Sequence, residues 1–261
     1  MIRRLAWRCA ILSIYIFLLA PLVCVVIVSF NAEAVQTFPP KSWSFRWYAH
    51  ALTVDSFRSG TWLSLLLAVS AALVATPIGV AAAFGLHRSN WRGKAALESL
   101  FLAPLIVPGI VIGISLLIAL AAMDVRDAPV RLLMAHVIAI LPYSIRTVLA
   151  SLSRLDPLLE EAAETLGASG FSAFWYVILP LIRPGIVAGL VFGLILSFDD
   201  VSVSLFLVDA RTTTLPIAIM SYLEYSFDPS VAAISSMLIA ATLGIAVLLE
   251  RGFGLKRLLA G

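Results

Sequence analysis

Two groups of acidic side chains interrupt an otherwise apolar chain. One group lies between two long apolar segments and contains Asp156, Glu160, Glu161 and Glu164. The other group, Asp199 and Asp200, lies within or at the end of an apolar segment. Carboxylates can attract a cation or contact a basic partner. Within a membrane an ionisable group is costly, and it usually faces a cavity or an opposite charge. The two groups are therefore the first candidates for function.

Residue types that enzymes use are present, but not in catalytic patterns. The three histidines, His50, His87 and His136, are scattered, and no His-Glu-x-x-His pattern occurs. Cys9 and Cys24 lie in or beside the first apolar segment and lack the spacing of metal ligands. The sequence contains no Gly-x-x-x-x-Gly-Lys-Ser/Thr phosphate loop, and no serine has a nearby His and acid. We expect no catalytic residue, metal or cofactor in this chain.

The composition is that of an integral membrane protein. Of the 261 residues, 61% are hydrophobic and only 13% are charged, and the mean hydropathy is +1.03. A soluble domain of this length would carry more charge on its surface. The net charge of +3 is no argument for nucleic acid, because the basic residues cluster beside apolar segments, where membrane topology explains them.

Six segments with few charges are long enough to cross a bilayer. A helix needs about 20 apolar residues to span the hydrocarbon core, so the first segment is also too long for a cleaved signal peptide. Backbone groups in lipid must be satisfied internally, and segments of this length favour helices. We predict an all-α membrane protein with one domain over residues 1–261. Its expected spans are 9–30, 61–86, 99–122, 132–152, 184–208 and 229–250.

The distribution of Lys and Arg predicts the orientation. Eleven of these residues flank the spans on the side that holds the two termini and the loops 87–99 and 153–183, and six lie on the opposite side. Positively charged residues favour the cytoplasmic side. We therefore expect both termini and the acidic 153–183 segment to be cytoplasmic.

Small residues and prolines predict how the spans pack. The second span is rich in Ala and Gly, which allow helices to approach closely, so we expect it to lie centrally in a bundle. Pro77, Pro104, Pro108 and Pro142 are expected to kink or break helices.

The 153–183 segment has the pattern of a helix–turn–helix. Asp156 can cap a helix that has Pro157 at its first position. Gly167 allows a left-handed C-cap and a reversal of the chain. Leu179-Pro180 is expected to close the segment before the fifth span.

This segment is predicted to be a docking surface for a soluble partner. Ala162 and Ala163 form helices well and have no bulk, so a partner can approach that face closely. A helix lying on the membrane is the alternative, but such helices favour Lys and Arg over acidic residues.

The spacing of residues in this segment resembles a known signature. Glu161-Ala162-Ala163 is followed by three residues, Gly167, nine residues and Val177-Ile178-Leu179-Pro180. This pattern resembles the EAA signature of bacterial ABC-importer permease subunits, whose usual ending is Ile-x-Leu-Pro, so the chain departs from it only at Val177. Two further stretches, 101–108 and 197–200 followed by 214–216, resemble the spermidine/putrescine permease branch.

The resemblance implies a pore-forming permease subunit of an ATP-driven importer in a bacterial inner membrane. It implies ATP and Mg on separate cytoplasmic ATPase subunits, an external solute-binding protein, and a second permease, expected to be a homologue in preference to an identical copy. A polyamine or similar organic cation is the first expected solute; an opine, ferric ion or an anion are alternatives. The residues implied in coupling to the ATPase are Glu161, Ala162, Ala163, Gly167, Leu179 and Pro180.

The candidate residues of the solute path are Asp199, Asp200, Tyr222 and Glu224. Carboxylates in a low dielectric attract an amine more strongly than in water, and an aromatic ring adds a cation–π face. Alternatively, the fifth span ends near Phe198 and leaves both aspartates in solvent or paired with Arg211. A stand-alone secondary transporter or channel for cations would also explain these acids, but it leaves the acidic 153–183 segment unexplained.

Overall fold

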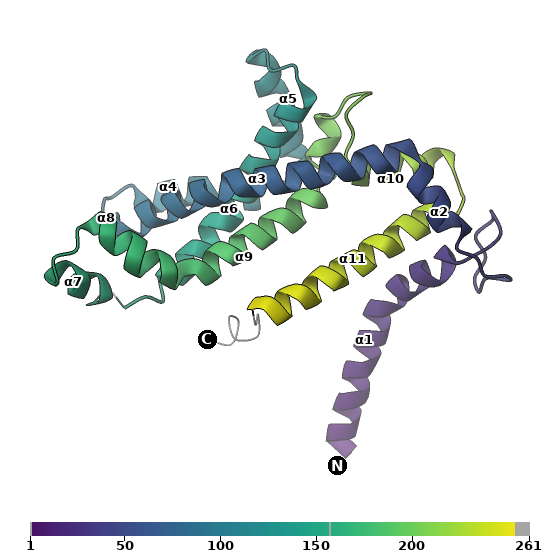
Figure 1. Ribbon diagram of the computed structural model, residues 1–261, viewed down its shortest axis with the longest axis horizontal. Helices are drawn as coiled ribbons and strands as arrows, with labels where there is room; N and C mark the ends of the chain where they lie inside the picture. Colours follow the sequence, from purple (N-terminus) through teal and green to yellow (C-terminus); the bar gives the residue numbers. More distant parts are fainter. Residues whose placement is uncertain (1, 157, 254–261) are drawn as a thin grey trace. The chain divides into compact units, whose positions relative to one another are not determined.

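The computed structural model describes residues 2–156 and 158–253, and these residues form helices, turns and one isolated bridge between Asn31 and Trp43. The predicted all-α fold is confirmed within this part of the chain. The chain divides into two compact units, whose elements are drawn in Figure 1. The first unit comprises Met1–Arg58 and Ala218–Gly261, and the second comprises Ser59–Ile217.

The first unit is built around α11, Ser230–Phe253, which packs against α1, Ile2–Ser29, and α2, Arg46–Thr53. Most of α1 is exposed, and its apolar part, Trp7–Ser29, is long enough to cross a membrane. Where α1 ends, the Ser29 hydroxyl and the Tyr48 hydroxyl are 2.6 Å apart, and the aromatic rings of Phe30 and Tyr48 are in contact.

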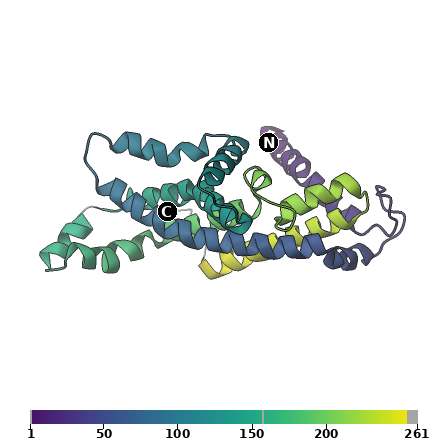
Figure 2. The same cartoon turned by 90° about the horizontal axis from the view of Figure 1, so that it is seen from above.

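In the second unit three long helices lie side by side (Figures 1 and 2). They are α3, Asp55–Arg88, α6, Ala128–Leu152, and α9, Leu179–Phe198. Shorter elements join them: α4 Lys94–Leu102, η1 Ala103–Leu105, α5 Gly109–Ala122, α7 Leu158–Thr165, α8 Gly170–Ala173, η2 Phe174–Ile178 and η3 Ser204–Phe206. α10, Leu215–Tyr225, begins in this unit and continues into the first.

Small residues bring the three helices together. Ala71, Ala72 and Ala75 of α3 are buried against Ile140 of α6. A Cβ atom added to Gly189 of α9 would lie 2.7 Å from the Thr147 hydroxyl oxygen of α6, so the two backbones meet where no larger residue fits. Gly185, one turn earlier, makes a similarly close approach to α6, whereas a Cβ atom added to Gly193, one turn later, would lie 3.2 Å from the Ile140 side chain of α6 and 3.6 Å from Ala72 of α3. The small residues of the second span thus pack against α6, and the central position of this span stays a prediction.

The expected third span is broken. Lys94–Leu105 and Gly109–Ala122 meet at 103°, because Pro104 lies in the 3-10 turn η1 and Pro108 is extended, with φ −55° and ψ 134°. Proline lacks a backbone N–H and restricts the residue before it, so the helix cannot continue through this pair. In contrast, α3 and α6 continue through Pro77 and Pro142.

The expected fifth span is shifted toward the N-terminus. An 184–208 helix was predicted, but α9 begins at Leu179 and ends at Phe198. A continuous helical stretch, Gly170–Phe198, is long and apolar enough to cross a membrane. The helix ends at Phe198 because the side chain of Asp200 accepts hydrogen bonds that start the next turn.

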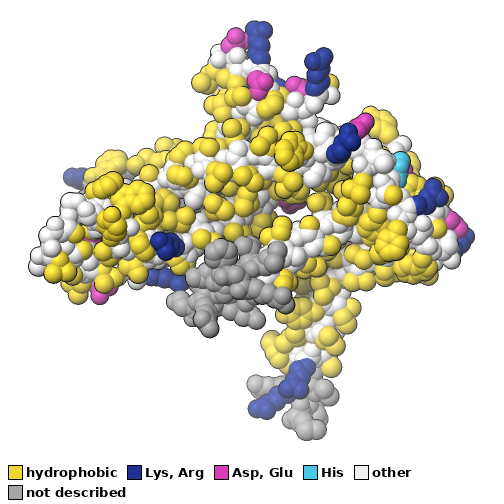
Figure 3. Space-filling view, in the orientation of Figure 1, with side chains coloured by type: hydrophobic (Ala, Val, Ile, Leu, Met, Phe, Trp, Pro, Cys, Tyr) yellow, Lys and Arg dark blue, Asp and Glu magenta, His cyan; other side chains and the backbone are white. Residues whose placement is uncertain are grey.

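The described residues contain four helices that are long and apolar enough to cross a membrane, or five if the bent pair counts as one span. The sixth predicted span corresponds to α11, of which the shorter stretch Ser230–Ile245 is apolar. Hydrophobic side chains gather on the visible face over α3 (Figure 3). Leu65, Leu66 and Leu73 of this helix are exposed. Such a surface is expected to contact lipid.

Candidate functional site

The predicted docking segment forms a helical hairpin that projects from the end of the three-helix core (Figure 1). As predicted, Asp156 caps its first helix, because the carboxylate accepts the Leu158 backbone N–H at 3.0 Å. Pro157 lies outside the described residues. No residue of α7 is buried. A helix with no buried face has little packing to stabilise it in this chain alone, which is typical of a surface that a partner covers.

Gly167 ends α7 in the left-handed region that the sequence predicted, with φ 90°. The Ala168 N–H donates to the Ala163 carbonyl oxygen at 3.0 Å, and the Gly167 N–H donates to that of Glu164 at 2.9 Å. These two bonds form a Schellman motif, which satisfies carbonyl groups at the end of a helix. Ala163 and Gly167 therefore hold the turn, while Glu161 and Ala162 on the same helix are exposed.

Leu179 and Pro180 do not close the hairpin, contrary to the prediction. They lie in the helical stretch Gly170–Phe198, directly after the π-helical turn η2. Pro180 has no N–H for a helical bond, and a π-helical turn widens the helix next to it. Leu179 packs on the apolar cluster around Ile178 and Ile182. The two residues thus connect the hairpin to α9 as one continuous helix.

An ion pair that was not predicted from the sequence joins the hairpin to α3. The Arg88 guanidinium donates to the Glu160 carboxylate, and it also lies over the Phe84 ring, 4.9 Å from the ring centre. The ring of Phe84 contacts that of Phe174 in η2. Arg88, Phe84 and Glu160 border a pocket of about 510 Å³ that Glu161 also lines. Arg88 thereby links the end of α3 to α7, a helix in which no residue is buried.

The second acidic group lies at the far end of α9. Asp199 is exposed, and within the described chain its side chain makes no hydrogen bond or ion pair. Asp200 is half-buried, and its carboxylate accepts from the Ser204 N–H at 2.8 Å and the Ser204 hydroxyl at 2.7 Å. The two neighbouring carboxylates therefore differ: that of Asp200 caps the η3 turn, and that of Asp199 is exposed.

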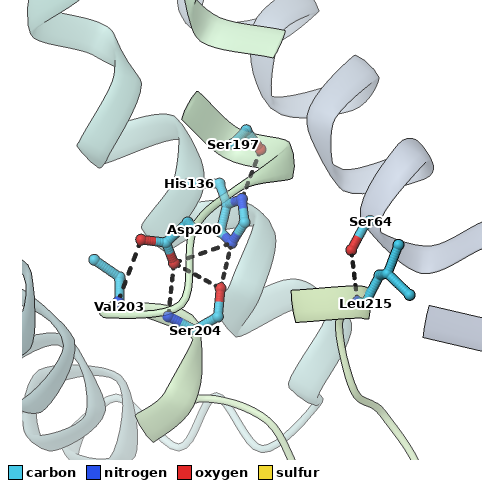
Figure 4. A network of polar contacts seen from close by, with 7 residues as sticks. All are labelled: Ser64, His136, Ser197, Asp200, Val203, Ser204 and Leu215. Carbon is cyan, nitrogen blue, oxygen red and sulfur yellow. Dashed lines mark hydrogen bonds and ion pairs between the residues drawn. The ribbon is translucent and has the colours of Figure 1, made fainter. Parts of the chain in front are cut away.

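His136 of α6 completes a buried polar network around Asp200 (Figure 4). Its Nδ1 is 2.6 Å from the Ser197 hydroxyl oxygen, and its Nε2 is 2.8 Å from that of Ser204. In the sequence, His136 is one of three scattered histidines and was not predicted to belong to the site. The signal was present, because an ionisable side chain in a membrane span requires a partner.

Arg211 does not pair with either aspartate among the described residues. It lies instead in a turn around Asp209, whose carboxylate accepts the backbone N–H groups of Arg211 and Thr212. The bond from the Arg211 N–H is the main cause that lowers the pKa of the Asp209 carboxyl. The alternative prediction was that the fifth span ends near Phe198 and leaves the aspartates in solvent or paired with Arg211. The helix does end at Phe198, but no ion pair with Arg211 forms among the described residues.

Tyr222 and Glu224 lie on α10, in the first unit. The Tyr222 hydroxyl donates to the Asp228 carboxylate at 2.8 Å, and its ring contacts Phe57. Burial raises the pKa of the Tyr222 hydroxyl, and the bond to Asp228 raises it further, so it stays neutral and polar. Glu224 is exposed. Among the described residues, no group of three His, Cys, Asp or Glu side chains is placed to hold a metal ion.

Comparison with known proteins places these features in a family. The model of the family described as "Binding-protein-dependent transport system inner membrane component" matches residues 75–255. The putrescine transport system permease protein PotI of Escherichia coli K12 is 32% identical over 91% of this chain and 87% of its own length. The spermidine/putrescine transport system permease protein PotC of the same strain is 32% identical over 88% of this chain and 87% of its own.

A solved structure has the same fold. It is that of a bacterial alginate ABC transporter in complex with an alginate pentasaccharide-bound periplasmic protein. One of its chains superposes with a TM-score of 0.72 over 96% of this chain and 94% of its own, at 16% sequence identity.

We predict that the Arg88–Glu160 ion pair holds α7 in place. Arg88→Glu should increase amide hydrogen exchange in Leu158–Thr165 by a few fold, because a partly exposed ion pair contributes about 0.2–1 kcal/mol. Combining it with Glu160→Arg should return exchange toward the wild-type rate. Arg92→Glu, an exposed residue of the neighbouring loop, is the matched control and should leave the helix unchanged. Equal exchange in Arg88→Glu and Arg92→Glu would show that the pair does not hold α7.

Proposed function

We propose that this chain, which belongs to the family of binding-protein-dependent transport system inner membrane components, is the permease subunit of an ATP-driven importer for a polyamine or a similar organic cation. The observation that carries the proposal is the 32% identity to two polyamine permeases along about nine-tenths of this chain. The chain has the membrane fold of such a subunit, and its two acidic sites fit the two tasks of coupling and passage.

The α7 hairpin would seat a cytoplasmic ATPase. Its helix is exposed, its Ala162 leaves room for close approach, and Glu161 presents a carboxylate that a basic side chain can contact. The reversal at Gly167 continues into the helical stretch that includes Leu179, Pro180 and α9. Movement of a docked ATPase would therefore reach α9 through the short turn at 166–169 and the continuous helix that follows it. ATP and Mg would bind to the ATPase and not to this chain.

The far end of α9 would attract the cation. Asp199 offers an exposed carboxylate at the end of an apolar helix, where the surroundings screen charge less than water does. Tyr222 and Glu224 are further candidates, since an amine can contact an aromatic face and a carboxylate. An anion would be repelled by Asp199. This charge favours a polyamine over the anionic alternatives.

The assembly would contain further chains. A second permease subunit, a homologue in preference to a copy, would complete the pore, and an external binding protein would deliver the solute. The description of the matched family, an inner membrane component of a binding-protein-dependent transport system, supports this assembly. The solved relative contains a periplasmic protein bound to its solute.

Transport by the reconstituted complex tests the function. With its ATPase, partner permease and binding protein in liposomes, the chain should import putrescine only when ATP is supplied, and sulfate should neither be carried nor compete. Uptake that persists without the ATPase would indicate a secondary transporter. Uptake of sulfate that putrescine does not affect would exclude the polyamine substrate and retain the permease class.

The turn at Gly167 tests the coupling site. Gly167→Val places a β-branched residue at φ 90°, where a side chain costs about 1–2 kcal/mol or more. We expect the protein to insert normally, to lose most of its copurifying ATPase and to import at least about tenfold less, the factor that 1.4 kcal/mol represents. Thr165→Val introduces the same side chain in helical conformation two residues earlier and should behave nearly as wild type. Full ATPase binding by Gly167→Val would remove the hairpin from the coupling role.

Cysteine labelling tests the orientation, in which both termini and the hairpin are cytoplasmic. In a background without Cys9 and Cys24, an impermeant thiol reagent should label Thr53→Cys in intact cells. It should label Asn90→Cys, in the loop beside the hairpin, only after the membrane is opened. Both positions are exposed in the structure. The reverse pattern would place the hairpin outside and contradict docking to an ATPase.

A further inference from the structure

His136 lies within the membrane bundle and is almost completely enclosed. Its side chain is 2% exposed, and it lies eight residues into α6, about 12 Å from the start of that helix. A polar ring in such a place is costly unless both nitrogens are hydrogen-bonded. The partners are Ser197 in the last turn of α9 and Ser204 at the start of η3, and both are buried too. One side chain therefore connects three elements.

The chemistry of the partners assigns a direction to each hydrogen bond. A serine hydroxyl has one hydrogen, and that of Ser204 donates to the Asp200 carboxylate, which can only accept. The Ser204 oxygen must then accept from the His136 Nε2–H. In the neutral ring Nδ1 is an acceptor, so the Ser197 hydroxyl donates to it. The result is one continuous chain of bonds from Ser197 through His136 and Ser204 to Asp200.

The η3 turn is held on its other side by α5. A Cβ atom added to Gly113 would lie 2.8 Å from the Phe206 ring, and one added to Gly109 would lie 2.8 Å from the Ser202 Cβ. Val203 and Leu207 are buried in an apolar cluster with Leu132 of α6. Packing of this kind presses the turn against α6 but does not fix its rotation, because apolar contacts are not directional. The hydrogen bond between His136 and Ser204 is directional, so it fixes how the η3 turn is rotated against α6.

The segment that follows η3 is also tied to the core by a polar contact. The Leu215 N–H donates to the hydroxyl oxygen of Ser64 in α3 at 2.9 Å (Figure 4). The stretch between Phe198 and Leu215 is thus anchored to α6 near its beginning and to α3 at its end. Asp199 lies just before the first anchor.

We infer that His136 is a positioning residue for solute passage. Its hydrogen bond to Ser204 holds Asp200 in the η3 turn, and Asp199 is left as the carboxylate that meets the cation. The observation that carries this is the continuous chain of hydrogen bonds, which uses Asp200 and stops short of Asp199. The inference rests on the proposed transport of an organic cation. It adds that the two adjacent aspartates do not act as an equivalent pair.

The test measures putrescine imported per ATP hydrolysed by the complete reconstituted complex. Asp199→Asn removes the exposed charge and should lower this ratio about tenfold, a loss in the range of hydrogen bonds to charged groups. His136→Phe keeps a ring of similar size but removes both bonds, and it should lower the ratio several fold. Both variants should retain ATP hydrolysis that the binding protein stimulates. A residue that only stabilises the fold would lower uptake and hydrolysis together.

Combining the substitutions separates positioning from stability. If His136 acts through Asp199, the double variant Asp199→Asn with His136→Phe should import no less per ATP than Asp199→Asn alone. Asp200→Asn should be milder than Asp199→Asn, because the amide oxygen can still accept from Ser204. Multiplying effects in the double variant, or an Asp200→Asn defect as deep as that of Asp199→Asn, would overturn the inference.

Two conservative variants identify the bond that matters. Gln can reach the place of Nε2 and donate to Ser204, whereas Asn reaches only the place of Nδ1 and can bond Ser197 alone. His136→Gln should therefore recover most of the wild-type ratio, and His136→Asn should resemble His136→Phe. Equal ratios in the Gln and Asn variants would show that the bond to Ser204 does not position the turn.

Two further variants serve as a control and as a substitute for His136→Phe. Ser144→Ala removes a buried hydroxyl from the same helix that has no hydrogen-bond partner among the described residues, and it should leave the ratio unchanged. If His136→Phe fails to assemble, Ser204→Ala breaks the same bond from the other side and enters the same comparison with Asp199→Asn. A wild-type complex that carries no putrescine would contradict the proposed function itself. A wild-type ratio in His136→Phe would contradict only the role of His136.

Discussion

The close approach of α6 and α9 is the constraint on which the two candidate sites of this unit depend. In a bilayer, burial of apolar side chains gives little drive for helices to associate, because lipid is as apolar as the helices. Contact between backbones must replace it, and glycine permits that contact. A Cβ atom at Gly185 would lie 2.6 Å from the Thr147 carbonyl oxygen, and one at Gly189, four residues later, would lie 3.1 Å from the Ser144 Cα. These contacts hold the first half of α9 against α6.

The two ends of α9 differ in their chemistry. α9 has 20 residues, about 30 Å of helix, which is close to the thickness of a hydrocarbon core. At its beginning the π-helical turn connects it to the α7 hairpin, and at its end Asp199 and Asp200 begin the η3 turn. We expect a helix held in this way to move as a rigid element, so that a displacement at its beginning would reach the aspartates at its end.

The sequence predicted the features that depend on local geometry. The cap at Asp156, the positive φ of Gly167 and the break near Pro104 follow from the preferences of single residues. Features that depend on distant partners were missed. Arg88 and Glu160 are 72 residues apart, and His136 is 61 residues from Ser197. The fifth span was placed wrongly because hydropathy does not distinguish a helix from the apolar turn that follows it. The Gly185, Gly189 and Gly193 spacing was visible in the sequence, but only a known neighbour gives it meaning.

In both acidic groups, a carboxylate that is bound within the chain holds an exposed neighbouring carboxylate in place. Each contains two adjacent carboxylates, Glu160 with Glu161 and Asp199 with Asp200, and adjacent side chains on a helix or turn point in different directions. In each pair one member is bound within the chain, Glu160 by Arg88 and Asp200 by Ser204. Its neighbour stays exposed, and within the described residues it has no ionic partner. The bound carboxylate fixes the backbone, so the exposed carboxylate is held in a defined place. No ion pair among the described residues neutralises its charge. An exposed charge that was not anchored in this way would lose conformational entropy on meeting its target.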